Sequence, residues 1–412
     1  MSLAAYPTYD SHKNSGEDWI EDVPSHWETR KLKQLFQEKK HRPNLALNCG
    51  SISFGEVVEK DDERVPLATK ASYQEVSKGE FLVNPLNLNY DLKSLRIGLS
   101  DIDVVVSAGY LVLQAKDDMD KRFFKYLLHR YDVAYMKLLG SGVRQTISFN
   151  HIANSILVAP PLPEQRAIAA FLDGKCAGVN EAVRIKEAQI ALLRERRQIL
   201  IQQAVTRGLN PAAPMKDSGI DWIGQIPAHW ELKSIRYAFR FRNYQRVPIS
   251  ASDREGKQGE YPYYGASGII DYVQDYIFDE DLILIAEDGA NLLSKSTPLA
   301  FVATGKYWVN NHAHILEPLF PGFKYWAELL SAADYTVYIS GSAQPKLTRD
   351  RLGSVRVPVP PADERNAIIS FIEQESDKFR NAISIKERQI AALKEYKTSL
   401  INAAVTGKIK VI

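Results

Sequence analysis

The sequence has little that would tie it to a disulfide framework, a metal site or a membrane. Its 412 residues include only two cysteines, Cys49 and Cys176, too few for a disulfide scaffold or a four-cysteine zinc site and typical of a reducing cytosol. No apolar run approaches the roughly 18 residues of a membrane span, and the N-terminal segment lacks the apolar core of a signal peptide. We therefore expect a cytoplasmic protein without a membrane partner.

Neither sign of charge is in excess. The 52 Lys and Arg residues almost balance the 50 Asp and Glu residues, for a formal net charge of +2. This balance excludes a histone-like basic protein and a disordered polyelectrolyte. The hydrophobic fraction of 45% is ordinary for a globular protein. At about 100–200 residues per domain, the length predicts two or three domains.

The chain contains an internal repeat. Pro24-Ser25-His26-Trp27 returns as Pro227-Ala228-His229-Trp230, 203 residues later. Of the 47 positions from 160 to 206, 20 are identical to the position 200 residues later. A period near 200 is too long for a solenoid repeat, so it indicates duplication of a domain and its connector. Residues 30–139 and 233–339 are almost unrelated, so the copies share a frame and differ in their inserts.

The block after each Pro-Pro pair is predicted to be one long helix. Its apolar residues recur in alternating steps of four and three, which favours a coiled-coil seam. The two blocks are obvious partners for an antiparallel pair, each about 65 Å long at 1.5 Å per residue. Lys186 and Lys386 interrupt the seam, where they could either fix the register or extend to solvent. The predicted seam residues are Leu172, Val179, Val183, Ile190, Leu193 and Leu200 in the first copy and Ile372, Phe379, Ile383, Ile390, Leu393 and Leu400 in the second.

The inserts read as mixed α/β with short strands and glycine-rich turns, and they carry no recognisable catalytic signature. There is no phosphate-binding loop or H-E-x-x-H motif, and Asn84-Pro85 is followed by Leu86, unlike an adenine-methyltransferase motif. His312 and His314 alternate as on a strand and could bind a metal, but without an evident third ligand a hydrogen-bonding role is favoured. Tyrosines interleaved with amide and basic side chains are residue types that contact phosphates and base edges.

The repeated residues resemble a known family. Pro160-Pro161, Glu164-Gln165-Arg166 and Phe171-Leu172, with their echo at 360–372 and the paired Pro-x-His-Trp segments, look like the DNA-specificity (S) subunit of type I restriction–modification systems. Blocks similar to its target-recognition domains are Gly265–Ile270, Asp288–Ala290, Asn310–His312 and Gly341–Arg349. One departure is Arg144-Gln145-Thr146 in the first copy where the second has Gln344-Pro345-Lys346, so these two loops need not be equivalent.

The resemblance implies an α/β (α+β) fold with two target-recognition domains joined by two long helices in an antiparallel coiled coil. The domains are expected at 1–160 and 209–360, and the helical regions at 161–208 and 361–412. Candidate DNA contacts are Tyr263, Tyr264, Ser267, Lys346 and Arg349, ranked above Tyr90, Lys93, Arg144 and Gln145.

The resemblance also implies partners. The double-stranded DNA target would be bipartite, with two modification (methyltransferase) subunits and restriction (translocase/nuclease) subunits bound to the chain. S-adenosylmethionine, ATP and Mg²⁺ would sit on those subunits, with no cofactor, metal or catalytic residue in this chain. The alternative is a coiled-coil scaffold without sequence readout.

Overall fold

The computed structural model describes residues 6–63, 65–86, 95–116, 118–136, 146–341 and 344–411. The chain forms two compact units, one from Met1–Lys186 with Arg388–Ile412 (unit 1) and one from Glu187–Glu387 (unit 2). Each unit therefore contains one insert and half of each long helix. The domain boundaries expected from the sequence lie at the helix ends, whereas the two compact units divide each long helix near its middle.

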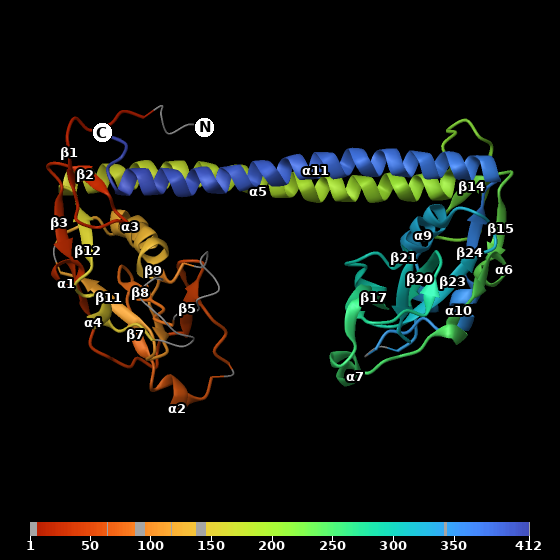
Figure 1. Ribbon diagram of the computed structural model, residues 1–412, viewed down its shortest axis with the longest axis horizontal. Coiled ribbons are helices and arrows are strands. Elements are labelled where there is room, and N and C mark those ends of the chain that lie inside the picture. The colour runs from red at the N-terminus through yellow and green to blue at the C-terminus, as the bar shows by residue number, and fades with distance from the viewer. Residues whose placement is uncertain are drawn as a thin grey trace. The chain divides into compact units, whose positions relative to one another are not determined.

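Unit 1 is built on a six-stranded sheet in the order β4-β11-β8-β9-β6-β5 (Figure 1). Smaller antiparallel pairs are β1 with β2, β3 with β12 and β7 with β10. The elements are β1 His12–Asn14, β2 Asp22–Pro24, β3 Glu28–Lys31, α1 Leu32–Leu35, β4 Phe36–Glu38, β5 Gly50–Ser53, β6 Glu56–Glu59, α2 Leu67–Lys70, β7 Gln74–Val76, β8 Phe81–Val83, β9 Ile97–Leu99, β10 Val104–Val106, β11 Leu111–Ala115, α3 Lys121–Ala134, α4 Phe149–Ile152 and β12 Ile156–Ala159.

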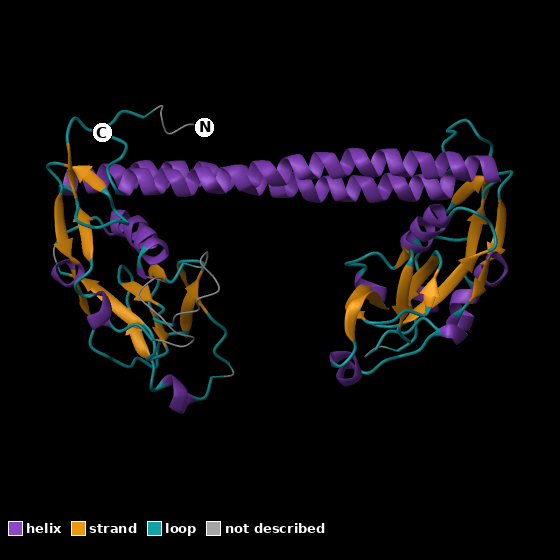
Figure 2. Cartoon of the chain, viewed as in Figure 1, coloured by secondary structure: helices purple, strands orange, loops and turns teal. Residues whose placement is uncertain are grey.

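Unit 2 has two four-stranded sheets, β16-β23-β20-β21 and β18-β17-β22-β19, and the pairs β13 with β14 and β15 with β24 (Figure 2). The elements are β13 Met215–Asp217, β14 Gln225–Pro227, β15 Glu231–Ser234, α6 Ile235–Ala238, β16 Phe239–Phe241, η3 Asn243–Gln245, α7 Ala251–Glu255, β17 Gln258–Gly265, β18 Gly268–Val273, β19 Phe278–Asp279, β20 Leu282–Ala286, α8 Asn291–Ser294, β21 Ala300–Ala303, β22 Lys306–Val309, β23 Ala313–Pro318, α9 Phe323–Ala332, η4 Thr336–Tyr338, α10 Arg349–Ser354 and β24 Arg356–Val359.

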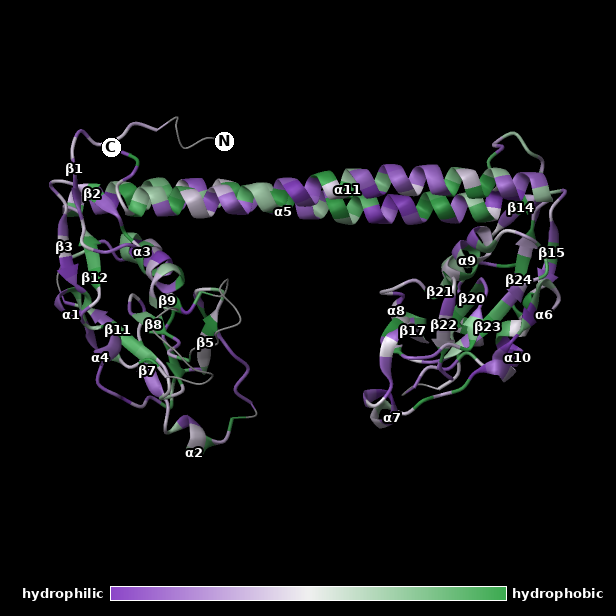
Figure 3. Cartoon of the chain, viewed as in Figure 1, coloured by the Kyte–Doolittle hydropathy of each residue, from purple (hydrophilic) through white to green (hydrophobic). Residues whose placement is uncertain are grey.

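The two long helices are α5 (Leu162–Arg207) and α11 (Ala362–Val405). Within each unit a half of α5 packs antiparallel against a half of α11, and both helices alternate hydrophobic and hydrophilic residues along their length (Figure 3). All twelve predicted seam residues are buried or half-buried. In unit 1, α3 buries Phe123, Phe124, Leu127 and Leu128 in the same core as Leu172 of α5. In unit 2, α9 takes the corresponding place beneath the helices (Figure 1).

Polar residues on the seam pair across it. Lys186 Nζ donates to Gln389 Oε1 at 2.7 Å, and Lys397 Nζ donates to Asn180 Oδ1 at 2.8 Å, both in unit 1. Both contacts are exposed to solvent, so each lysine extends to the surface and also reaches the partner helix, and the structure fits both roles expected from the sequence.

The repeated Pro-x-His-Trp motif forms a hydrogen-bonded junction with the start of each long helix. In unit 1, Glu164 accepts from Trp27 Nε1 at 2.9 Å and lies 2.6 Å from His26 Nε2. In unit 2, Glu364 accepts from Trp230 Nε1 at 3.0 Å and lies 2.5 Å from His229 Nε2. Burial opposes ionisation of Glu164, but the hydrogen bonds outweigh it and hold its pKa below the ordinary value. The repeated Pro-x-His-Trp motif thus connects each insert to the start of the long helix that follows it.

After each long helix the chain turns at a glycine that packs against the junction tryptophan of that unit. Gly407 follows α11 at a φ of 73° and lies against Pro24 and Trp27 in unit 1. Gly208 follows α5 at a φ of 72° and lies against Pro227 and Trp230 in unit 2. In unit 1 the backbone N–H of Lys410 then donates to Pro7 O at 2.7 Å. Over the described ranges, no helix combines the length and apolar character needed to cross a bilayer.

Candidate nucleic-acid interface

Three segments of unit 2 meet at one end of the sheet β16-β23-β20-β21, and we call them the loop cluster. They are Glu287–Gly289 after β20, Asn310–His312 before β23, and Gln344–Leu347 before α10. Ala286, the last residue of β20, pairs with Ala313, the first of β23, so the segments flanking this pair share one sheet edge. A β-bridge between Asp288 and Lys346 adds the third segment.

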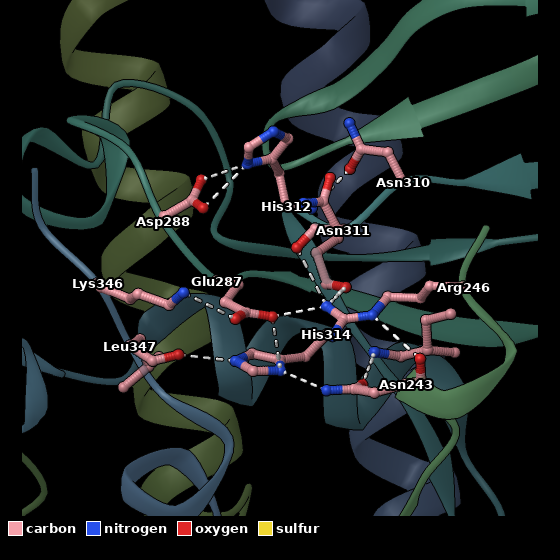
Figure 4. A network of polar contacts seen from close by, with 12 residues as sticks. Asn243, Arg246, Glu287, Asp288, Asn310, Asn311, His312, His314, Lys346 and Leu347 are labelled. Atoms are coloured by element: carbon pink, nitrogen blue, oxygen red, sulfur yellow. Dashed lines mark hydrogen bonds and ion pairs between the residues drawn. The ribbon is translucent and has the colours of Figure 1, made fainter. Parts of the chain in front are cut away.

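The buried layer of the loop cluster centres on His314, whose ring lies between two fixed partners (Figure 4). Its Nε2 lies 2.7 Å from Leu347 O, and its Nδ1 lies 2.8 Å from the Asn243 amide nitrogen. The Asn243 side-chain oxygen accepts from Ile315 N, which fixes the amide orientation. His314 therefore donates from Nε2 and accepts at Nδ1 as a neutral ring. Burial lowers its pKa, in agreement with this state.

Glu287 lies between two cations of the cluster, Arg246 and Lys346, and beside the neutral ring of His314. Its carboxylate lies 2.6 Å from Arg246 NH1, 3.4 Å from Lys346 Nζ and 3.5 Å from His314 Nδ1, with its side chain 13% exposed. Burial opposes ionisation, but the hydrogen bond from Arg246 and the surrounding positive charge hold the pKa of Glu287 below its ordinary value. Its backbone carbonyl accepts from Leu347 N at 2.7 Å. Glu287 thus joins all the elements that carry the site.

The outer layer of the cluster is the pair Asp288 and His312. Nδ1 of His312 lies 2.9 Å from both Asp288 carboxylate oxygens. The buried Asn310 accepts the backbone N–H of His312 through its side-chain oxygen at 2.8 Å. Asn310 N donates to Tyr264 O at 3.0 Å, which connects the cluster to the β17–β18 hairpin.

The predicted DNA contacts occupy different depths. Tyr263 in β17 is buried, its hydroxyl bonds to the backbone of Ile249, and the Arg254 guanidinium covers its ring, so its side chain is not on the surface where a DNA contact is expected. Tyr264 is half-buried against Phe301 and Tyr307, and burial raises the pKa of its hydroxyl.

Three of the predicted contacts are exposed, namely Ser267, Lys346 and Arg349. Ser267 lies in the β17–β18 turn, and Arg349 begins α10, where its guanidinium lies 5.4 Å from the Phe241 ring centroid. Tyr90, Lys93, Arg144 and Gln145 fall outside the described residues.

Sequence reasoning missed Asn243 and Glu287, and it noted Arg246 only as a residue type that contacts DNA, whereas the structure pairs it with Glu287. The available signal was the pair of acidic residues directly after the apolar run Leu282–Ala286, since charge at a buried strand end needs partners. Across the part of the chain that the structure describes, no group of three or more His, Cys, Asp or Glu side chains is arranged to hold a metal ion. The two predicted histidines serve hydrogen bonding in two different layers.

A family model described as the type I restriction modification DNA specificity domain matches residues 24–177 and 227–395. The chain belongs to this DNA-specificity family. Each matched segment covers one insert and part of the long helix after it, so the specificity domain occurs twice, as the internal repeat predicts. The loop cluster lies in the second specificity domain.

Similar proteins carry the same family name. The chain is 34% identical over 134 residues to a Haemophilus influenzae protein assigned as the type I restriction enzyme specificity subunit S.HindORF215P, a match covering 32% of this chain and 33% of that one. It is 22% identical over 430 residues to a Methanocaldococcus jannaschii protein assigned as the MjaX specificity subunit, covering 95% and 96%.

A solved structure shares the fold. It comes from work on complex assembly and conformational transition of the type I restriction–modification system, with a TM-score of 0.63 at 15% identity, covering 93% of this chain and 98% of that one. The predicted α/β fold with two specificity domains and long helices is therefore confirmed. The chain is a specificity subunit with two DNA-recognition domains.

Proposed function

We propose that this chain reads a bipartite DNA sequence, with unit 1 recognising one half-site and unit 2 the other. The observation that carries the proposal is duplication with divergence. The Trp–Glu junction and helix closure are the same in both units, while the inserts differ in sequence and strand order. Two readers on a common frame suit two unlike half-sites, because each base pattern in the major groove demands its own side chains.

In this proposal the exposed cations of unit 2 bind the DNA backbone and the loop cluster faces base edges. Lys346 and Arg349 supply positive charge, and Ser267 supplies a hydroxyl that can donate or accept. A near-neutral chain can bind DNA in this way, because only the facing surface needs positive charge.

The long helices would set the spacing between half-sites. An α-helix is rigid along its axis, and α5 and α11 each contribute to both units. Two modification subunits would bind the frame and methylate DNA with S-adenosylmethionine, and restriction subunits would add ATP- and Mg²⁺-dependent translocation and cleavage. The chain itself would supply recognition and no catalytic group. A cytoplasmic location belongs to the same proposal.

Selection of DNA sequences by the purified complex with its modification subunits tests the proposal. We expect enrichment of two short sequences separated by a gap of fixed length.

Exchange of residues 30–140 for the insert of another specificity subunit should alter one half-site only. Adding or deleting residues within 173–200 or 373–400 should change the gap or abolish binding. A complex that assembles but enriches no sequence would support the scaffold alternative.

A further inference from the structure

The imidazole of His312 is held on one edge and open on the other. Its Nδ1 is fixed by both oxygens of Asp288 at 2.9 Å, and its backbone is fixed by Asn310. The His312 side chain is 47% exposed, whereas that of Asp288 is 16% exposed. In Figure 4 the second ring nitrogen points away from Asp288. The ring is thus oriented by its neighbours with Nε2 facing outward.

Asp288 is itself anchored. It pairs with Lys346 in a β-bridge, and the next backbone N–H, that of Gly289, donates to Pro345 O at 3.1 Å. The carboxylate that holds His312 therefore belongs to a backbone fixed on two sides. An imidazole oriented in this way loses little conformational freedom when it meets a ligand.

The contact with Asp288 also decides where the proton of a neutral ring sits. An ionised carboxylate only accepts hydrogen bonds, so Nδ1 of His312 carries the hydrogen. Nε2 is then left with a free lone pair and is an acceptor. His314, two residues along, differs because both of its nitrogens have partners within the protein. The same strand start therefore carries one histidine that builds the fold and one whose outer nitrogen faces solvent.

We propose that His312 is a specificity-determining residue, whose Nε2 accepts a hydrogen bond from the exocyclic amino group of an adenine or a cytosine. This inference rests on the proposed function. In the neutral form Nε2 accepts and does not donate, so the partner that the proposal assigns to it on DNA is a hydrogen-bond donor. In the major groove the donors are N6 of adenine and N4 of cytosine.

Among the described residues of unit 1, no such pair occupies the equivalent place. The pairing of β8 with β11 in unit 1 corresponds to the pairing of β20 with β23 in unit 2. Continued past the strand ends, this register places Leu86 where unit 2 has Asp288, and Gly109 where unit 2 has His312. The contact is therefore confined to the half-site that unit 2 reads, and the other half-site is an internal control. The unit 2 half-site is the one that survives exchange of residues 30–140.

The test uses the complex with its modification subunits and the enriched duplex, without S-adenosylmethionine. In each half-site every adenine is replaced singly by purine, which lacks the N6 amino group, and every cytosine by pyrimidin-2-one, which lacks the N4 amino group. We expect one unit 2 position at which the wild type loses about 5- to 150-fold in affinity, the range for one specific base contact. His312→Ala should lose the same factor of affinity for the natural duplex, relative to the wild type. Replacing the base by its analogue should then cause no further loss of affinity in this variant.

Asp288→Asn provides a second variant that keeps the ring and most of the packing. Its amide can donate to Nδ1, which moves the hydrogen to Nε2 and removes the acceptor, so it should lose affinity at the same base position. Asp279→Asn, the same change at an exposed residue of β19, should leave every response unchanged. Asp288→Asn decides the question if His312→Ala is poorly folded.

The inference would be overturned if, at every base position, the loss of binding free energy caused by His312→Ala and the loss caused by the base analogue simply added. The two changes would then remove different contacts. Coupling of His312→Ala to 7-deazaguanine would also overturn it, since that would show a protonated ring donating to guanine. Failure to enrich any sequence would instead overturn the proposed function, and this inference with it. An amino-group contact confined to unit 1's half-site would refute His312 while leaving bipartite reading intact.

Discussion

The two units are alike where the insert joins the long helices and unlike at the far end of the sheet. At the junction, Trp27 and Trp230 make the same hydrogen bond to a glutamate at the start of a helix. At the sheet end, strand register aligns the charged Glu287 of unit 2 with Pro85 of unit 1, and the buried His314 with Leu111. An ionic layer in one reader is thus an apolar layer in the other.

One polar position between these extremes is shared. Lys39 follows β4 and donates to Glu80 at 2.8 Å, and Arg242 follows β16 and donates to Glu317 at 2.9 Å. The backbone N–H groups of these two residues also pair with equivalent carbonyls, of Val112 and Ile315. The cation and its backbone pairing are therefore equivalent, but its glutamate is not, since register aligns Glu317 of unit 2 with Gln114 of unit 1. The junction is therefore kept while the inserts differ in strand order and in the side chains at the sheet end.

The largest expected effect tests the shared junction. Trp27→Ala and Trp230→Ala should each reduce the free energy of unfolding of their own unit by about 3–5 kcal/mol, because both side chains are fully buried and each deletion leaves a cavity. Amide hydrogen exchange resolved by unit measures the two losses. Tyr237→Ala, at a 69% exposed position, should change little. Clearly unequal tryptophan effects would show that the junctions are not energetically equivalent.

A somewhat smaller effect tests the divergent end. Glu287→Ala should destabilise unit 2 by about 2–4 kcal/mol, because Arg246 and Lys346 would lose the carboxylate between them in a mostly buried site. Denaturant unfolding with unit-resolved exchange is the measurement. Glu280→Ala, which removes an exposed carboxylate from the same unit, should have an effect below about 1 kcal/mol. Equal effects would mean that the buried network adds no stability beyond that of a surface pair.

The helix closures provide a matched pair of glycines. Gly407→Ala should cost unit 1 about 2–3 kcal/mol, and Gly208→Ala should cost unit 2 about 1–2 kcal/mol. Both adopt left-handed backbone, but a Cβ on Gly407 would lie 2.3 Å from Pro24, whereas one on Gly208 would lie 3.1 Å from Trp230. Thermal unfolding of the two variants compares them. A larger loss for Gly208→Ala would contradict the tighter closure of unit 1.

Mild acid should have the smallest effect. Burial lowers the pKa of His314, so below about pH 6.5 the unfolded chain binds a proton that folded unit 2 does not, and stability falls by up to about 1.4 kcal/mol per pH unit until the folded pKa is reached. In unit 1, burial lowers the pKa of His129 to about 4, which gives the same sign. His129→Leu should flatten the dependence in unit 1 alone. Unfolding followed between pH 7 and 5 measures both slopes, and a flat profile for unit 2 would exclude a neutral buried His314.

The carboxylate of Glu287 adds a separate step in stronger acid. Its pKa is held below the ordinary value, so its stabilising contribution is complete above about pH 4.5 and is lost as the pH falls through the folded pKa. Unit 1 has Pro85 at this place and should lack the step. The pH profile of Glu287→Gln compared with the wild type isolates it.

The helices and the duplicated frame were predictable from sequence because their signals are local or repeated. Seam residues such as Leu172 and Ile372 recur at heptad spacing, and such a pattern predicts a helix whatever the surrounding fold. The strand orders were not predictable, because nothing near Leu282 or Lys306 in the sequence specifies its neighbour in a sheet.

The site was only partly predictable for a related reason. An exposed residue in a turn, such as Ser267, can be inferred from a glycine-rich segment. Tyr263 lies in the same kind of segment, yet a bulge in β17 beside it and the loop around Ile249 bury it. Glu287 was missed because its three partners lie 41, 27 and 59 residues away and only folding brings them together.

The division of the chain into units has a consequence for its synthesis on the ribosome. Unit 2 is one continuous stretch, Glu187–Glu387, whereas the core of unit 1 includes Leu400, Ala404 and Val405. The second reader can therefore fold while the first, although made earlier, still lacks its helix partner. Until residues 388–411 emerge, α5 near Leu172 can pack against α3 but lacks the part of α11 that completes this core. The first domain to be translated is thus the last to be completed.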